Sequence, residues 1–524
     1  MGTLTTTQMA GLNSTQLAAM TVTQVVGLTT TQLANLASNQ LAVMSATLVK
    51  GLTSSQVRGF LPSQMAGLNS VQIAGLTSTQ MAAFTPTQIG GMESNDVAVL
   101  VPTQIVGMSF EQLAGMVPGQ VGGISSAVMG ALSTAQIKGL SETLVAALGS
   151  IQLRGLTSVQ LGSLTSTQLD GFNSDQLKQF STTQIRALSS GQLATLSTTQ
   201  IAGIGSALFG AMATDQVRGL STEHLASLTT TQLAGVGSQQ LAVLTSDQLV
   251  GLRGDQLGSL GSVQMNGLQS LQLQTLSESQ CSGLTSAQLA SWADTQWNGL
   301  LSTQLAFMAD NQLNGLTSTV FKSLAFTQLA GLSSSQIVGL ANTQLDGLSS
   351  AQMQSLTTLQ LDGLLSTQLK ALANTQLNGL TSIQLASLVD TQLSGLSTTQ
   401  VAGLANTQLG ALNSAQIMGI TPAQMAALTT SAVLSLTITQ IDGLTSGQIK
   451  AMTKTQIAVL SAIQLDELSI VQVQAIANTW DGVSSNFAAG KSAWTAAGLT
   501  STQVGALNNL HDTGAGAMSV LWGV

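Results

Sequence analysis

Charged and aromatic side chains are scarce in this chain of 524 residues. Asp, Glu, Lys and Arg together make up 6% of the residues, aromatic residues make up 3%, and tyrosine is absent. The formal net charge at pH 7 is −8, with only 13 Lys and Arg residues spread along the chain. Such a surface offers no basic footprint for nucleic acid or for anionic membranes. We therefore expect neither among the partners.

Residues that perform chemistry are equally rare. Cys281 is the single cysteine, so no disulfide bond can form within the chain, and His224 and His511 are the two histidines. Two isolated histidines make no metal site. The acidic residues follow no regular ladder, and calcium-binding loop sequences are absent; examples are Asp170, Asp175, Asp215, Asp247 and Asp255. We expect no enzyme, and no catalytic, cofactor-binding or metal-binding residues.

Long apolar runs are also missing. Hydrophobic residues make up 44% of the chain, but they are dispersed in pairs, and no run approaches the ~20 residues that span a bilayer. Met1 is followed almost at once by the first repeat, without the basic and apolar regions of a signal peptide. The sequence predicts no membrane insertion and no N-terminal signal peptide. Three alternatives stay open: a cytoplasmic location, export by a route that does not read the N-terminus, or a chain that is a fragment of a longer protein.

What the chain has is an uninterrupted repeat of eight residues. Every eighth residue from Leu4 to Ile476 is apolar, over 60 consecutive positions. With Leu4 as position a and Gly11 as position h, position e is Gln in 51 of the 59 octads from Gln8 to Gln472, and position f is apolar throughout. A phase held this long indicates identical small units, each contacting mainly its neighbours. Function is then expected on the surface of a stack.

Each octad is expected to fold as one very short helix. Positions a and f have opposite parity, so a single flat strand would send them to opposite faces. Ser, Thr or Asn dominates position b, and Gln follows three residues later, which is the spacing of a capping box. The apolar residues at a and f then form a hydrophobic staple. A β-solenoid is the alternative fold.

Proline and glycine positions support the helix boundaries. All five prolines fall at position c, which is the first helical residue, where the missing N–H costs nothing; they are Pro62, Pro86, Pro102, Pro118 and Pro422. Position h would end the helix, and glycine there is expected to take the left-handed conformation of a C′ residue.

A second period of sixteen residues overlies the first. Glycine occupies position h in 24 of 30 octads of the series that begins at Gly11, but in 6 of 29 octads of the alternate series that begins at Ala19. We interpret this as two short helices in each 16-residue coil. The predicted fold class is an all-α repeat, a thin α-solenoid of capped helices.

The less common side chains are mostly interpreted as structural. Cys281 and Phe321 at position f, and Trp292 and Trp297 at positions a and f, are expected in the core. His224 replaces Gln at position e, where an imidazole still serves as a cap partner. Cationic side chains at position g are expected in solvent; they are Lys50, Arg58, Lys138, Arg154 and Lys178.

The octad register ends at Ile476, so we divide the chain into an octad solenoid, 1–476, and a C-terminal segment, 477–524. The second segment contains Trp480, Trp494 and Trp522, and we interpret it as a cap, an assembly segment or an export segment. Leu4 already belongs to the array, so its first stacking face is expected to be open. An open face at one end and a specialised unit at the other permit head-to-tail self-association.

Octads such as Leu-Thr-Ser-Thr-Gln-Leu-Ala-Gly resemble the Leu-Thr-x-x-Gln arrays of large bacterial surface and secreted proteins. The resemblance implies an extracellular or cell-surface structural role, with export through a C-terminal signal, and it transfers no catalytic residue. We expect a rigid solenoid that assembles into filaments or a surface layer. The alternative is an adhesin stalk or a solenoid module that binds a glycan, a peptide or ice.

Overall fold

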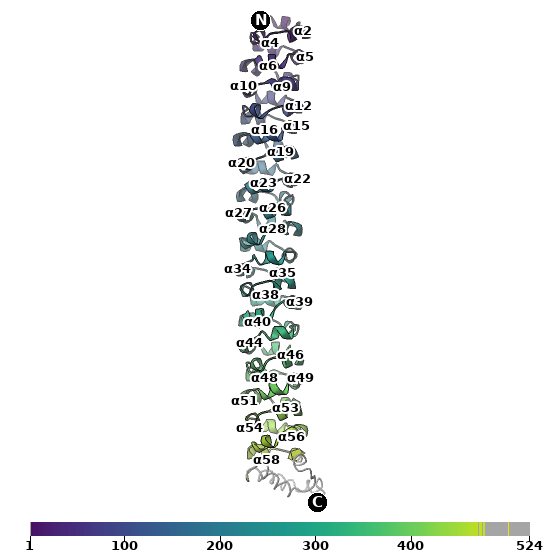
Figure 1. The fold of residues 1–524 in the computed structure, drawn as a ribbon, viewed down its shortest axis with the longest axis vertical. Helices are drawn as coiled ribbons and strands as arrows, with labels where there is room; N and C mark the ends of the chain where they lie inside the picture. The colour runs from purple at the N-terminus through teal and green to yellow at the C-terminus, as the bar shows by residue number, and fades with distance from the viewer. Residues whose placement is uncertain (1, 470, 474, 477–500, 502–524) are drawn as a thin grey trace. The chain divides into compact units, whose positions relative to one another are not determined.

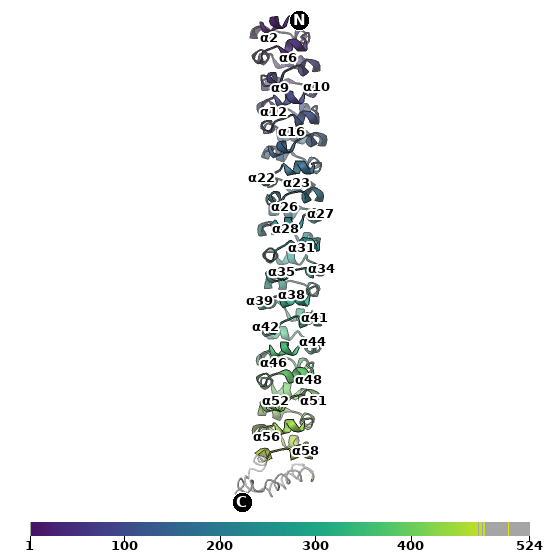
Figure 2. The ribbon, with the colours of Figure 1, turned by 180° about the vertical axis from the view of Figure 1, so that it is seen from behind.

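The computed structural model describes residues 2–469, 471–473, 475, 476 and 501. The chain divides into two units, of which the first comprises residues 1–268 and the second begins at Gln269. Each unit is a succession of very short helices, drawn in Figure 1 and seen from behind in Figure 2. Residues 2–469 contain 58 helices, residues 471–473, 475, 476 and 501 are also helical, and none of the described residues forms a strand. The all-α repeat solenoid predicted from the octads is therefore confirmed.

One octad makes one helix, without exception. The helices run from α1 (Thr6–Ala10) to α58 (Ala462–Asp466), and every one begins at position c, so that αn begins at residue 8n − 2. Most have five residues and end at position g. Helices of four residues end at position f; they are α8, α13, α15, α22, α25, α29, α33, α34, α37, α39, α43 and α47. Helices of six residues end at position h; they are α6, α9, α10, α16, α19, α23, α26, α28, α35, α40, α44, α46, α48, α52, α53 and α56.

The helix starts are those that the capping pattern predicts. In α1, the extended N-cap residue Thr5 (φ −73°, ψ 158°) accepts a hydrogen bond from the Gln8 N–H, and the Gln8 side chain accepts one from the Thr5 N–H. Each of the five prolines is the first residue of its helix. A helix of one turn leaves most of its N–H groups without an intrahelical partner. The reciprocal caps therefore supply partners for a large share of the backbone N–H groups that each helix leaves unpaired.

Three helices, and not two, make one coil. Every substantial contact between helices joins αn to αn+3, for example α16 (Ser126–Ala131) to α19 (Ser150–Gly155) in the first unit and α53 (Pro422–Ala427) to α56 (Ser446–Ala451) in the second. The predicted 16-residue coil is wrong, and the coil has 24 residues. Each octad, with its extended residues between helices, turns the chain by about one third of a circle. We call helices that lie three apart a column.

The interior of each coil consists of the side chains at positions a and f. Leu313 and Leu316 are 1% and 5% exposed, and the same pattern holds along both units. Positions b, c, d and g face outward over most of their length, as Asn314 does. A short helix has room for one apolar stripe, and a and f lie on that stripe. The core assignment from sequence is confirmed.

Glycine at position h serves close packing and not a left-handed turn. The residue has right-handed values, as at Gly59 (φ −78°, ψ −7°), so the predicted C′ conformation is wrong. A Cβ at Gly379 would overlap the carbonyl oxygen of Ser350, which is the first residue of α44 (Ser350–Ser355) in the preceding coil. Glycine therefore permits one backbone to approach another.

The 16-residue period follows from the columns. Helices αn and αn+3 belong to opposite glycine series, so the two series alternate along every column. Position h of the glycine-rich series meets backbone atoms, as Gly379 does. In the other series, the nearest contact for a Cβ added at Gly339 would be the Asp310 side chain, at 3.3 Å. Gly339 therefore lies in a looser contact than Gly379, although Gly115 of the same series would meet the carbonyl oxygen of Pro86. The period is real, but it describes neighbouring coils and not one coil.

The C-terminal segment lies almost wholly outside the described residues. The predictions for 477–524 as a cap, assembly or export segment, and those for Trp480, Trp494, Trp522 and His511, concern that part of the chain. Among the described residues, no helix is long and apolar enough to cross a membrane.

Candidate functional site

The feature that joins one coil to the next is the glutamine at position e. Gln376 lies in α47 (Asn374–Leu377), and its side chain is 4% exposed. Its Oε1 accepts a hydrogen bond of 2.9 Å from the N–H of Ala373, the N-cap residue of the same helix. Its Nε2 donates to the carbonyl oxygens of Leu345 and Leu348 in the preceding coil, both at 2.8 Å. One amide thus caps its own helix and the end of another.

The same arrangement recurs through both units. Gln64 donates to Leu33 and Leu36, and Gln408 donates to Leu377 and Leu380, at the same offsets of 31 and 28 residues. We call these side chains the ladder glutamines. The position requires an acceptor and a donor on one short planar group, which an amide supplies and a carboxylate does not. A carboxylate would also be buried opposite carbonyl oxygens.

Sequence reasoning found only half of this role. The capping box explains the bond from Oε1, but a capping box takes Glu as readily as Gln. Position e holds 51 glutamines and no glutamate. That exclusion was the available sign that Nε2 has a partner of its own. Eight octads depart from glutamine; they hold Leu48, Asp96, Val128, Leu144, Leu208, His224, Val320 and Ala432.

His224 reproduces two of the three bonds of a ladder glutamine: the N-cap bond and the bond at an offset of 28 residues. It lies in α28 (Thr222–Ser227) and is 5% exposed. Its Nδ1 lies 3.1 Å from the backbone N of Ser221, and its Nε2 lies 2.7 Å from the carbonyl oxygen of Leu196. The predicted role as a cap partner is confirmed, and the bond to the preceding coil extends it.

The remaining candidates in the second unit are core residues. Cys281 is fully buried in α35 (Glu278–Gly283), where burial and the nearby Glu278 carboxylate raise the pKa of its thiol to about 11. Trp292 and Trp297 are buried with ring centroids 5.4 Å apart, and Phe321 is fully buried. These predictions are confirmed. A thiol with such a raised pKa is a poor nucleophile.

In the described residues, the charged side chains other than Asp96, which is buried at position e, lie at the surface and form no cluster. The cationic residues at position g are exposed, as predicted, and the five acidic residues named above are exposed as well. Over the described residues, the ion pair is Arg253 with Asp255, at 3.0 Å, and it lowers the pKa of the Asp255 carboxyl. No group of His, Cys, Asp and Glu in that part of the chain could hold a metal ion.

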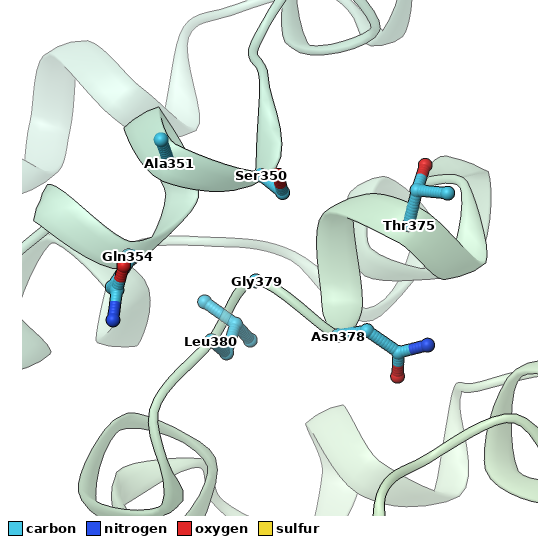
Figure 3. Close-up of a pocket in the computed structure, with 7 residues that line it drawn as sticks. All are labelled: Ser350, Ala351, Gln354, Thr375, Asn378, Gly379 and Leu380. Atoms are coloured by element: carbon cyan, nitrogen blue, oxygen red, sulfur yellow. The ribbon is translucent and has the colours of Figure 1, made fainter.

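A surface depression of about 500 Å³ lies where two neighbouring coils of the second unit meet. Figure 3 shows its lining, which consists of Ser350, Ala351, Gln354, Thr375, Asn378, Gly379 and Leu380. Gly379 faces Ser350 across it, at the close approach described above. The lining contains no group that titrates near neutral pH. The depression is thus a consequence of coil stacking and carries no catalytic group.

The first coil presents ladder glutamines whose second bond is not made. Gln8, Gln16 and Gln24 accept hydrogen bonds of 2.8–3.0 Å from their own N-cap N–H groups, but they are exposed. In the described residues their Nε2 atoms donate to no carbonyl oxygen. From Gln32 onward the bond to the preceding coil is present, beginning with Leu4 at 2.6 Å. We call the three exposed side chains the N-terminal donor row.

These features define the class of the protein as an all-α repeat solenoid. The ALTTAQ repeat family model matches residues 145–182 and 172–206. No curated protein matches the chain in sequence. Similar solved structures include "Structure of APUM23-GGAAUUGACGG" (13% identity, 99% of this chain, 92% of that chain, TM-score 0.13) and "Structure of APUM23-GGAUUUGACGG" (13%, 99%, 92%, 0.14). TM-scores of this size carry no argument about shape or function.

Proposed function

We propose that this protein is structural and not enzymatic: a subunit that assembles head to tail into a filament or a surface layer outside a bacterial cell. The polarity of the ladder carries the proposal, because each coil donates through its glutamines to the coil before it and accepts from the coil after it. The low charge and the resemblance to bacterial surface and secreted repeat proteins favour the extracellular location.

The partner that best fits the N-terminal donor row is another copy of the chain. Each coil of this fold presents, on the side away from the N-terminus, the carbonyl oxygens that a ladder glutamine binds. Gln8, Gln16 and Gln24 present three amide donors in the same geometry. A contact between these unlike faces is heterologous, and repetition of a heterologous contact produces an open polymer unless it closes into a ring. We propose that the segment 477–524 serves the subunit as a cap or assembly segment.

The test is electron microscopy and sedimentation of the purified chain without any ligand. We expect regular polymers from the unaltered protein and their loss in the triple variant Gln8→Glu, Gln16→Glu, Gln24→Glu, because carboxylates would face carbonyl oxygens of the next subunit. The matched control, Thr7→Glu, Thr15→Glu, Thr23→Glu, adds the same charge on the same helices at exposed positions. Monomeric unaltered protein, or equal assembly of the two variants, would overturn the proposal.

A row of threonines favours a second candidate, a glycan-binding or ice-binding module or an adhesin stalk. Exposed threonines stand at position d in five successive helices of one column of the second unit; they are Thr295, Thr319, Thr343, Thr367 and Thr391. Their helices are α37 (Asp294–Trp297), α40 (Ser318–Ser323), α43 (Asn342–Leu345), α46 (Ser366–Ala371) and α49 (Asp390–Ser394). Co-sedimentation with insoluble polysaccharides, and thermal hysteresis at an ice surface, test this role. Replacement of the row by alanine should abolish a genuine signal.

A further inference from the structure

Position e, where coils are joined, is almost free of titratable groups. A glutamine amide neither gains nor loses a proton near neutral pH. Two described octads differ, because Asp96 lies at this position in α12 (Ser94–Ala98) and His224 in α28. Both side chains are buried, at 3% and 5% exposure. The two contacts therefore respond to pH in a way that the glutamine contacts do not.

The surroundings of His224 fix its protonation state. The backbone N–H of Ser221 can only donate, so Nδ1 must carry a lone pair. The carbonyl oxygen of Leu196 can only accept, so Nε2 must carry the hydrogen. The folded contact thus requires the neutral imidazole with its proton on Nε2. In this form the ring accepts a hydrogen bond at one atom and donates one at another, as the glutamine amide does.

We propose that His224 is a proton-sensitive joint, at which protonation of the imidazole breaks the N-cap bond of α28 and thereby weakens the packing of this helix on the preceding coil. An imidazolium carries hydrogen on both nitrogens and has no acceptor left. The new Nδ1 hydrogen would face the Ser221 N–H, and the N-cap bond of α28 would be lost. The joint would also bury a positive charge that no carboxylate contacts directly in the described structure.

The nearby charges do not remove this conflict. Helix α28 contacts α25 (Thr198–Ile201) and α31 (Ser246–Val250), and the bond to Leu196 reaches the end of α24 (Ser190–Ala194). Helices α24 and α25 carry no charged side chain, whereas α31 carries Asp247 and α28 carries Glu223. Arg218 lies on α27 (Thr214–Arg218). All three charged side chains are exposed, so solvent screens them from the buried ring.

Asp96 provides an internal contrast with the opposite sign. Its Oδ2 accepts from the Glu93 N–H at 3.1 Å, and its Oδ1 accepts from the Ser70 hydroxyl at 3.4 Å. Burial raises the pKa of this carboxyl. Protonation would remove a buried charge there and add a donor. Acid therefore favours the joint at Asp96 and opposes the joint at His224.

Hydrogen exchange of the full chain, followed by mass spectrometry between pH 7.5 and 5, tests the proposal. After correction for intrinsic exchange rates, protection of α24–α28 should fall as the pH is lowered, by up to tenfold per pH unit. The variant His224→Gln restores the majority residue and should abolish the fall. Helices α46–α49, joined through Gln368, Gln376, Gln384 and Gln392, serve as the internal control.

The tautomer provides a readout that folding stability alone would not move. Nitrogen NMR of histidine-labelled protein at pH 7.5 should show the Nε2–H tautomer at His224, with His511→Gln used for assignment. The proposal is overturned if the ring is protonated on Nδ1. It is also overturned if His224→Gln shows the same loss of protection as the unaltered chain, or if the unaltered chain shows none.

Discussion

The ladder predicts that one charge-changing substitution strongly destabilises one octad and leaves another nearly unchanged. The buried Gln376 amide accepts a hydrogen bond from its own N-cap residue and donates to the preceding coil. The exposed Gln16 makes only the bond from its own N-cap residue, Asn13. Glutamate preserves shape and keeps the acceptor that caps the helix. It removes the donor. The difference in stability between Gln376→Glu and Gln16→Glu therefore measures the contribution of the hydrogen bonds between coils.

The magnitude follows from the bonds at Gln376. Two donor bonds to Leu345 and Leu348 are lost, at about 1 kcal/mol each, and an unpartnered buried carboxylate raises the total to about 3–5 kcal/mol. Gln16→Glu should change local stability by less than about 0.5 kcal/mol, since an exposed carboxylate near a helix N-terminus is tolerated. Thermal denaturation and local hydrogen exchange measure the two effects. Equal effects would refute the ladder as a stabilising contact.

The pH dependence of Gln376→Glu provides a second check. Burial and two facing carbonyl oxygens raise the pKa of the introduced carboxyl above the about 4.3 of an exposed glutamate. The neutral acid can donate to one carbonyl oxygen. The destabilisation should thus be smallest below about pH 4 and should grow as the pH rises through the folded-state pKa. A destabilisation that is constant over pH would mean that the introduced side chain reaches solvent.

Three further predictions follow from the same packing. Gly379→Ala should lower the free energy of unfolding by about 1–3 kcal/mol, because a Cβ would meet the backbone of Ser350. Gly339→Ala should be nearly neutral in a thermal melt. Similar losses in the two variants would exclude the difference between a tight contact at Gly379 and a looser one at Gly339. Leu313→Asp should disrupt local protection from hydrogen exchange, and Asn314→Asp should not, so tolerance at both would remove the core assignment. Cys281 should alkylate at pH 8 about a hundredfold more slowly than a free thiol, since its pKa of about 11 lowers the thiolate fraction; fast labelling of the native chain would contradict this.

Local features were predictable because they depend on residues close in the chain. Thr5 and Gln8 satisfy each other's backbone partners across three residues, so the capping box is visible in the sequence. Pro422 marks a helix start for a reason internal to its own residue. The octad alone therefore determined where every described helix begins. It also determined which two side chains face the core.

The candidate site was less predictable, because its partners lie in another coil. Nothing near Gln376 indicates that Leu345 and Leu348 would receive its Nε2 hydrogens. The left-handed glycine was wrong for the same reason, since the residue that Gly379 must accommodate is Ser350, 29 positions earlier. Only the preference for glutamine over glutamate hinted at a donor role. His224 was placed correctly, but its second bond depended on Leu196.

The sequence by itself determined the unit: a capped single-turn helix with an apolar residue on each side of its start. Only the tertiary structure decided how many units close a coil. That number depends on the angle through which the extended residues at positions a and b turn the chain, and no periodicity of side chains encodes an angle. Three helices per coil set the offsets of 28 and 31 residues at which ladder glutamines find their carbonyl oxygens. The turn angle therefore determines which carbonyl oxygens each ladder glutamine binds.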